Sequence, residues 1–205
     1  MLKIWGRTNS VNVKKALWAL EELRVPYQRI DAGLQYGVVN TPEYRAMNPN
    51  GLVPTIDDEG FILWESHAIV RYLCAKHGAG SLWPDDLRVR ADSDRWMDWA
   101  FTFAAVLRPV FWNLIRTPPE KRAHKLIEEG AQKAGELATY VDARLADRPY
   151  LAGDSLTMGD IPLGCHLQLW FRLDIARPAV PKLRGWFERL CARPAYAKIV
   201  DIALS

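Results

Sequence analysis

The sequence predicts a small α/β domain followed by a domain made only of helices. Short apolar segments typical of strands occur only near the start of the chain, and every patterned segment beyond residue 87 has helical spacing. Between the two parts lies a stretch rich in Gly, Pro and Asp, which is typical of a linker. We therefore expect an α/β domain over residues 1–78, a linker over 79–87 and a helical domain over 88–205.

Turn and helix-breaking residues divide the first domain into its elements. The Val25-Pro26 pair ends a helical pattern, and Glu59-Gly60 forms the turn of a hairpin. The predicted order is strand, helix, strand, irregular loop, hairpin and helix. These elements are residues 2–5, 13–23, 27–30, 33–51 with a short helix around Pro42–Met47, 55–64, and a helix from Ser66 to Gly78.

The second domain shows start signals and a proline expected to kink its first helix. In the long aromatic stretch of residues 88–116, we expect Pro109 to bend the helix. Thr157 and Asp160 fit a capping box, in which the Thr oxygen accepts the Asp160 N–H and the carboxylate reaches back. A cap explains Asp160 without a catalytic role. The remaining helices are expected from Pro118-Pro119 to about 146, over 157–173, near 181–192 and over 195–203.

Composition excludes several classes of function. The net charge is +3 over 205 residues without a basic run, so no nucleic-acid partner is indicated. No apolar run approaches the roughly 20 residues that span a bilayer. Lys3 and Arg7 interrupt any apolar signal region at the N-terminus, which favours a cytoplasmic protein.

Cysteine and histidine residues are few and scattered. Cys74, Cys165 and Cys191 form no CxxC motif and lie within apolar helical patterns, which favours buried thiols over a catalytic cysteine or disulfides. The histidines have no metal-ligand spacing, so we expect no metal. They are His67, His77, His124 and His166.

Two segments of the first domain carry groups suited to binding a ligand. Residues 8–12 place hydroxyls and amides beside the free N–H groups of a helix start, where an anion such as a thiolate is stabilised. A plain N-cap is the alternative. Pro54 enters a strand, and a cis bond before it would turn the Val53 N–H and C=O outward, ready to pair with an extended peptide. A tight turn is the alternative there.

A third segment places Glu65 and Ser66 at the start of a helix that follows a strand. Ser66 and the helical N–H groups can take a carboxylate, and Glu65 can take an ammonium beside it. An amino-acid head group carries both charges on one carbon. A cap with a favourable acid in its first turn would need the same residues.

Together, in this order and spacing, the three segments resemble the glutathione transferase superfamily. The Asn48–Pro54 stretch is similar to its cis-proline loop, Glu65-Ser66 to its γ-glutamyl-binding pair, and Thr157–Asp160 to its capping motif. The resemblance covers nearly the whole chain. It implies a thioredoxin-like N-terminal domain, an all-α C-terminal domain and a detoxifying, cytoplasmic homodimer in which the first domain docks on the partner's second domain.

The resemblance also implies how glutathione would lie. Its γ-glutamyl end would bind Glu65 and Ser66, and its cysteinyl backbone would pair with Val53 before cis-Pro54. Its sulfur would face Ser10 and Asn12, with no tyrosine nearby. Ser10 matches the activating serine of theta-like classes and Asn12 matches the nu class, and both assignments stay open. The activated thiolate would attack an electrophilic substrate.

Two parts of the site are left undetermined. Many family members have Lys or Gln at the position of Leu52, where it contacts the glycyl carboxylate. Tyr36, Asn40 and Arg45 are the candidates to replace it. The second-substrate pocket is expected from Phe103, Leu107 and Phe111, although the same stripe also suits a core.

Other functions on the same fold compete with conjugation. Glutathione-dependent disulfide reduction is one, given Asn12. A non-catalytic protein that binds glutathione or apolar ligands is another. Such a protein would be expected to lose the key groups, whereas Ser10, Pro54, Glu65 and Ser66 are all present, which favours an enzyme.

Overall fold

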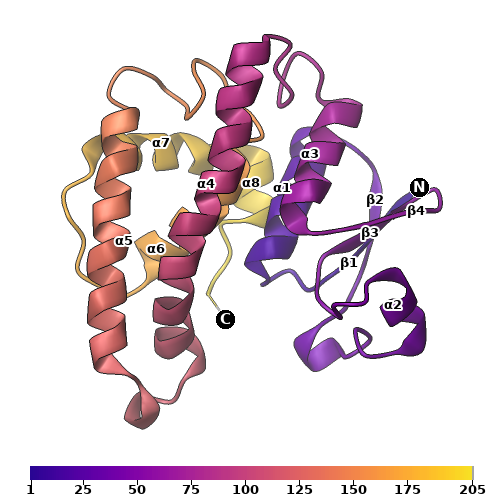
Figure 1. Cartoon of the computed structure of the whole chain (residues 1–205), viewed down its shortest axis with the longest axis horizontal. Helices are drawn as coiled ribbons and strands as arrows, with labels where there is room; N and C mark the ends of the chain where they lie inside the picture. The colour runs from indigo at the N-terminus through magenta and orange to yellow at the C-terminus, as the bar shows by residue number, and fades with distance from the viewer. Residues whose placement is uncertain (205) are drawn as a thin grey trace.

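A mixed four-stranded sheet forms the centre of the N-terminal part (Figure 1). The computed structural model describes residues 1–204, so residue 205 of the predicted helical domain lies outside the described residues. The strand order is β2-β1-β3-β4, with β1 and β2 parallel and the other pairs antiparallel. The strands are β1 (Leu2–Trp5), β2 (Tyr27–Ile30), β3 (Thr55–Asp58) and β4 (Phe61–Trp64).

Two helices connect and cover this sheet. Parallel β1 and β2 need a crossover, and α1 (Val11–Glu22) provides it. It packs beside α3 (Ser66–His77), and both helices lie between the sheet and the C-terminal part of the molecule (Figure 1). The short α2 (Pro42–Met47) lies apart from them, in the loop between β2 and β3. These elements match the predicted order.

The C-terminal part contains only helices. No helix of residues 1–204 is long and apolar enough to cross a membrane. The last helix is shorter than predicted, because it ends at Ile199 rather than near residue 203. The helices are α4 (Leu87–Phe111), α5 (His124–Arg144), α6 (Asp160–Arg172), α7 (Pro181–Cys191) and α8 (Pro194–Ile199).

The prediction that Pro118-Pro119 opens α5 is wrong. The second proline begins a separate 3₁₀ turn, Pro119–Lys121, and α5 starts at His124. The connection is held against the end of α4 instead. Arg122 donates hydrogen bonds to the carbonyls of Leu114 and Thr117, at 2.7 and 3.3 Å. These contacts hold a loop with a 3₁₀ turn where the sequence pattern suggests the start of the α-helix.

The helix α4 continues past its internal proline. Pro109 lies inside α4, and the chain then widens into a π-helical turn at Trp112–Arg116. The Asn113 side chain donates to the Pro109 carbonyl at 3.0 Å. Such π turns occur often at functional sites, and this one lies at the end of α4 opposite the linker.

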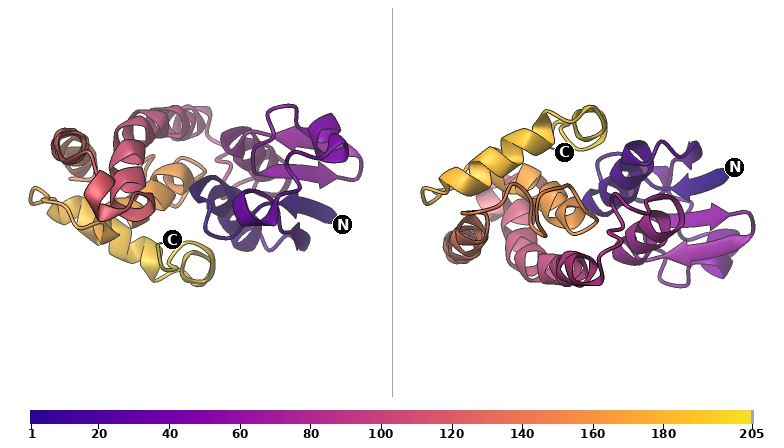
Figure 2. Two further views of the ribbon diagram at one scale, coloured as in Figure 1. Left: turned by 90° about the horizontal axis from the view of Figure 1, so that it is seen from below. Right: turned by 90° about the horizontal axis from the view of Figure 1, so that it is seen from above.

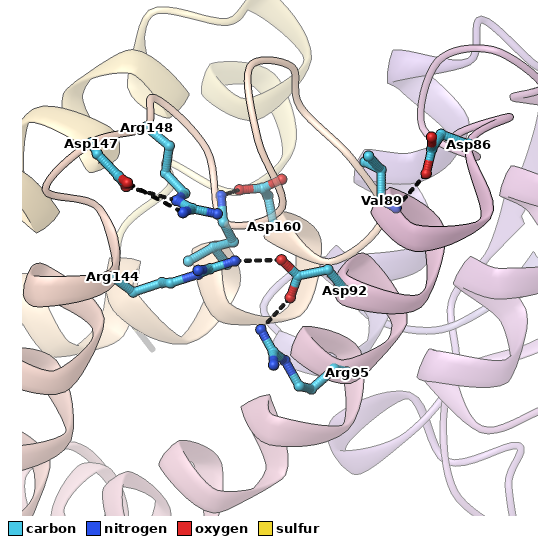
Figure 3. Close-up of polar contacts among 9 residues, drawn as sticks. Asp86, Val89, Asp92, Arg95, Arg144, Asp147, Arg148 and Asp160 are labelled. Atoms are coloured by element: carbon cyan, nitrogen blue, oxygen red, sulfur yellow. Dashed lines mark hydrogen bonds and ion pairs between the residues drawn. The ribbon is translucent and has the colours of Figure 1, made fainter.

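Polar contacts fix α4 against its neighbours (Figure 3). Asp86 caps α4 by accepting hydrogen bonds from the N–H groups of Arg88 and Val89. Asp92, on the first turns of α4, accepts from Arg95 on the same helix and from Arg144 on α5. The contact between Asp92 and Arg144 joins α4 to α5 near the upper end of the helix pair.

The predicted capping box at the start of α6 forms with a different pattern. The Asp160 carboxylate reaches back to the Thr157 N–H at 2.9 Å, as predicted. The Thr157 hydroxyl, however, donates to that carboxylate, and the Asp160 N–H donates to the Thr157 carbonyl instead. The carboxylate also accepts from the Leu151 N–H and from the Trp186 indole, so it connects three segments of the helical domain.

Helix α1 lies between the sheet and the C-terminal helices (Figure 2), and its buried side chains hold the two parts of the chain together. Trp18 packs edge-on against Tyr196 of α8, with ring centroids 4.8 Å apart. The Tyr196 hydroxyl donates to the Gly164 carbonyl of α6 at 3.0 Å. Lys14 donates to the Val200 carbonyl at 3.1 Å. The helix that begins at Ser10 is thereby fixed on both sides, by the sheet and by the C-terminal helices.

Candidate active site

Ser10 lies at the start of α1 with its side chain buried. It occupies the N-cap position, yet its hydroxyl accepts no hydrogen bond from the helix. Within residues 1–204, no other group bonds that hydroxyl either. The backbone N–H groups of the first turn have no intrahelical partner. The site therefore offers an unused hydroxyl and free amides to an anion, and the simple-cap alternative does not describe it.

Asn12 is exposed on the first turn of α1 and is held from below by a buried lysine. Lys15 Nζ donates to Asn12 Oδ1 at 3.0 Å and lies 3.0 Å from His67 Nε2. Burial lowers the pKa of Lys15 to about 8, although the charge of the Glu65 carboxylate acts in the other direction. Lys15 was not predicted as a site residue, because lysine side chains usually face the solvent.

His67 is the neutral partner of this contact. Burial, with the charge of Lys15 next in importance, lowers the pKa of His67 to about 2. Its Nε2 must therefore accept the proton that Lys15 donates. The imidazole also stacks on Phe101 of α4, with ring centroids 4.0 Å apart. His67 thus connects the start of α3 with both α1 and α4.

The loop before β3 leaves a peptide unit open. The Val53-Pro54 bond is cis, as expected. Within residues 1–204, the Val53 N–H and C=O make no hydrogen bond. The loop is braced from behind by Tyr44 and Asn48, whose side chains donate to the Leu52 carbonyl at 2.6 and 3.0 Å. The arrangement presents the Val53 main chain as an edge to which an extended peptide can be added.

Glu65 and Ser66 lie at the start of α3, as predicted. Glu65 is exposed, and its backbone has φ 72°, a conformation that is costly for any residue except glycine. Such local strain is concentrated at functional sites. Ser66 is buried, and within the described residues neither side chain caps the helix. The pair is therefore free to bind a ligand.

The residues near the expected glycyl end are arranged around Arg45. Leu52 is 65 % exposed. The Arg45 guanidinium packs against Gly51 and donates to the Pro49 carbonyl at 2.7 Å and to Asn40 at 2.9 Å. Arg45 is thus the cation that the structure places beside Leu52, with Asn40 as its support.

The aromatic stripe of α4 is mostly core. Phe103 is 0 % exposed and packs edge-on near Trp170, and Leu107 is also buried. Their burial favours the core interpretation that the sequence left open. Phe111 differs, because it is only partly buried at the end of α4. Trp96 is buried as expected, whereas Trp99 is half-exposed.

The cysteines have the properties of packing residues. Burial raises the pKa of Cys74 and Cys165 to about 12 and that of Cys191 to about 11. None of the three forms a disulfide. At neutral pH they stay protonated and are poor nucleophiles. Within residues 1–204, no three side chains of the metal-binding types gather into a cluster.

Comparison with known proteins places the chain in a family. Residues 9–76 match the family described as "Glutathione S-transferase, N-terminal domain", and residues 102–194 match "Glutathione S-transferase, C-terminal domain". Glutathione S-transferase GstB of Escherichia coli K12 is 41 % identical, covering 100 % of both chains. The probable glutathione S-transferase GSTF2 of rice is 31 % identical, covering 98 % of this chain and 96 % of that one.

A solved structure agrees with these relatives. The theta class glutathione S-transferase of Xanthomonas axonopodis pv. citri, crystallised with glutathione bound, superposes with a TM-score of 0.96. It is 49 % identical, and the match covers 100 % of this chain and 99 % of that one. Theta is one of the two classes, theta-like and nu, that residues 8–12 of this chain resemble.

Fold and site together define a two-domain protein, with a thioredoxin-like domain followed by an all-helical domain. The cis-proline loop and the open helix start lie in the first of these domains. With both family matches and the full-length relatives, the chain belongs to the glutathione S-transferase family and is a transferase enzyme.

Proposed function

We propose that the protein conjugates glutathione to an electrophilic substrate, with Ser10 activating the thiol. The observation that carries the proposal is the hydroxyl of the buried residue Ser10, which makes no hydrogen bond within residues 1–204 although it stands at a helix start. A free thiol has a pKa of about 8.5, so only a few per cent is thiolate at neutral pH. A hydroxyl that donates to the thiolate favours it by about 1.5–3 kcal/mol.

The proposed pose follows the open groups of the thioredoxin-like domain. The γ-glutamyl carboxylate binds Ser66 and the α3 amides, and its ammonium binds Glu65. The cysteinyl main chain pairs with the unbonded N–H and C=O of Val53, beside Pro54. The sulfur then faces Ser10, with Asn12 as a second donor.

The second substrate binds on the helical side of the sulfur. Phe111 is the proposed contact there, because it is the residue of the predicted stripe that is not fully buried. We propose a thioredoxin-like domain over 1–78, a linker over 79–87 and a helical domain over 88–205, in a protein that acts as a cytoplasmic homodimer; the family matches over residues 9–76 and 102–194 support the division into two domains. The electrophile itself is not specified by these contacts.

The test is the pKa of the bound thiol, followed by ultraviolet difference absorption as glutathione ionises on the protein. We expect the wild-type protein to lower the pKa of the bound thiol by about two units, equivalent to about 2.7 kcal/mol. In Ser10→Ala we expect this pKa to return most of the way to that of free glutathione. The rate should fall about 10- to 100-fold, with little change in glutathione affinity.

Other outcomes separate the rival functions. A lowered pKa that Ser10→Ala leaves unchanged would move the activating role to Asn12. Turnover of a mixed disulfide without turnover of an aryl halide would indicate reduction in place of conjugation. An unshifted thiol in wild type would contradict thiol activation and favour a non-catalytic binding protein.

A further inference from the structure

Two adjacent lysines on α1 are buried, which is unusual for this residue type. Lys14 is 2 % exposed and Lys15 is 1 % exposed. Both lie in the first turns of a helix, where the helix dipole disfavours a cation. A buried lysine is costly unless it is paired, so each needs a compensating partner.

Lys14 has a structural partner. Its Nζ donates to the carbonyl of Val200, the C-cap residue of α8, at 3.1 Å, and lies 3.5 Å from Gln168 Oε1. The carboxyl end of a helix carries partial negative charge, which compensates a cation. Lys14 therefore joins α1 to the C-terminal helices and needs no further function.

Lys15 has no such compensation. Its two contacts, Asn12 Oδ1 and His67 Nε2, are neutral acceptors. Within residues 1–204, no carboxylate lies within 4.0 Å of its Nζ. The Glu65 carboxylate favours the charged form of Lys15, but within the described residues it forms no ion pair with this buried ammonium.

The position of Lys15 relates this charge to the glutathione site. Lys15 lies five residues after Ser10, or about 7.5 Å along the helix axis. Asn12, which it holds, is one turn nearer the start of the helix and shares its face. His67, its other contact, directly follows Ser66. Lys15 therefore connects the sulfur end of the proposed site with the γ-glutamyl end.

We propose that Lys15 is a positioning residue of the glutathione site, whose ammonium orients the Asn12 amide and electrostatically favours the bound thiolate. The inference rests on the proposed function. Asn12 Oδ1 accepts a hydrogen bond from the Lys15 ammonium. The Nδ2 donors of the same amide therefore point away from Lys15. The ammonium of Lys15 and the bound thiolate are expected to interact appreciably, because a protein interior weakens the attraction between charges less than water does.

Other titratable groups surround Lys15. Glu65 lies at the start of α3, and its carboxylate favours the charged lysine. His67 on α3 and His166 on α6 are both held neutral by burial, and Cys165 on α6 stays a thiol. Two other cations act on this group, Lys14 on Cys165 and Arg71 on His67. At neutral pH the Lys15 amine is an ammonium, and its charge is lost as the pH rises through about 8.

The two lysines provide a matched experiment. The pKa of bound glutathione is measured in wild type, Lys15→Met and Lys14→Met, with thermal unfolding recorded for each. We expect Lys15→Met to raise the thiol pKa by about one unit, a tenfold loss of thiolate at low pH. Lys14→Met should leave the thiol pKa unchanged, even where it lowers the unfolding temperature.

The outcomes distinguish the two proposals. If wild type itself does not lower the thiol pKa, the proposed function fails. If wild type lowers it and both lysine variants behave like wild type, or both raise it equally, the role of Lys15 is overturned while the proposed function stands.

A second measurement does not require a variant that folds. Thermodynamic reciprocity demands that a nearby thiolate raise the pKa of Lys15 by as much as Lys15 lowers that of the thiol. Lysine labelled with ¹³C at Cε is titrated by NMR in wild type, with glutathione or with S-methylglutathione, which has no ionisable thiol. We expect a higher pKa for the buried ammonium in the glutathione complex. Equal values in both complexes would overturn the inference.

Discussion

At the scale of single residues, Leu52 stands where the resemblance to glutathione transferases leads us to expect a lysine or glutamine. An exposed leucine cannot bind the glycyl carboxylate, and Arg45 is the cation beside it. We predict that Leu52→Lys tightens glutathione binding about two- to fivefold, because an exposed ion pair contributes up to about 1 kcal/mol. Isothermal titration calorimetry measures the change.

Two controls separate charge from shape at this position. Leu52→Met keeps the apolar character and should bind glutathione as wild type does. A glutathione analogue amidated at its glycyl carboxylate should gain nothing from Leu52→Lys. A gain that persists with the amide would show that the lysine does not act on the glycyl end.

The protein groups that we propose to bind glutathione were only partly predictable from the sequence. Ser10, Val53, Glu65 and Ser66 stand at helix starts and strand ends, where local sequence shows unused polar groups. Lys15 could not be found in this way. Its burial depends on α3 and α6 packing over α1, and its partner His67 is distant in sequence. The spacing of residues along one helix does not reveal a contact with a residue on another helix.

At the scale of elements, the start of α6 depends on one carboxylate. Asp160 accepts hydrogen bonds from the Leu151 N–H, from the Thr157 N–H and hydroxyl, and from the Trp186 indole, at 2.9 to 3.1 Å. Asp160→Ala would leave these buried donors unpaired. We predict a loss of about 3 kcal/mol or more, or about 6–12 °C in Tm, measured by thermal unfolding.

Asp147→Ala is the control, because Asp147 is an exposed acid of the same domain that pairs only with its neighbour Arg148 (Figure 3). It should change stability by no more than about 0.5 kcal/mol. Similar losses in both variants would contradict the view that Asp160 holds the helical domain together.

Element boundaries were predicted well where turns or caps determine them. The hairpin turn has Glu59 and Gly60 at φ 56° and 92°. Gly60 adopts this conformation readily, which is why the sequence predicted the turn, whereas Glu59 adopts it at a cost. The predicted start of α5 was wrong because Arg122 donates hydrogen bonds to carbonyls just after the end of α4, and these hold the preceding segment in place. These hydrogen bonds depend on how the chain turns after α4, and they override the preference of proline for a helix start.

At the scale of the whole molecule, the two domains share one interface built on α1. Trp18 and Tyr196 meet there, and Glu22 pairs with Arg193 through two hydrogen bonds of 2.7 Å. The sequence predicted both domains as separate units but could not predict this docking, which depends on residues about 170 positions apart. Because α1 also carries Ser10, the position of the reactive sulfur relative to the helical domain depends on this interface.

The predicted homodimer has a physical reason in the sheet. β4 is an edge strand, and its Phe61 is 49 % exposed while tilted against Tyr72 of α3. An apolar edge strand is normally covered by another element or chain. We predict a dimer by multi-angle light scattering, with Phe61 in its interface. Phe61→Glu should weaken the dimer at least about tenfold, since burying such a side chain contributes about 1.5–3 kcal/mol.

Leu126→Glu provides the comparison for this surface. Leu126 is an apolar residue of similar exposure, 41 %, on α5, at the opposite side of the molecule from β4 (Figure 1). Leu126→Glu should leave the dimer intact, because its helix lies away from β4, the strand that we expect in the interface. A monomeric wild type would refute the dimer, whereas a dimer that tolerates Phe61→Glu would place its interface away from β4.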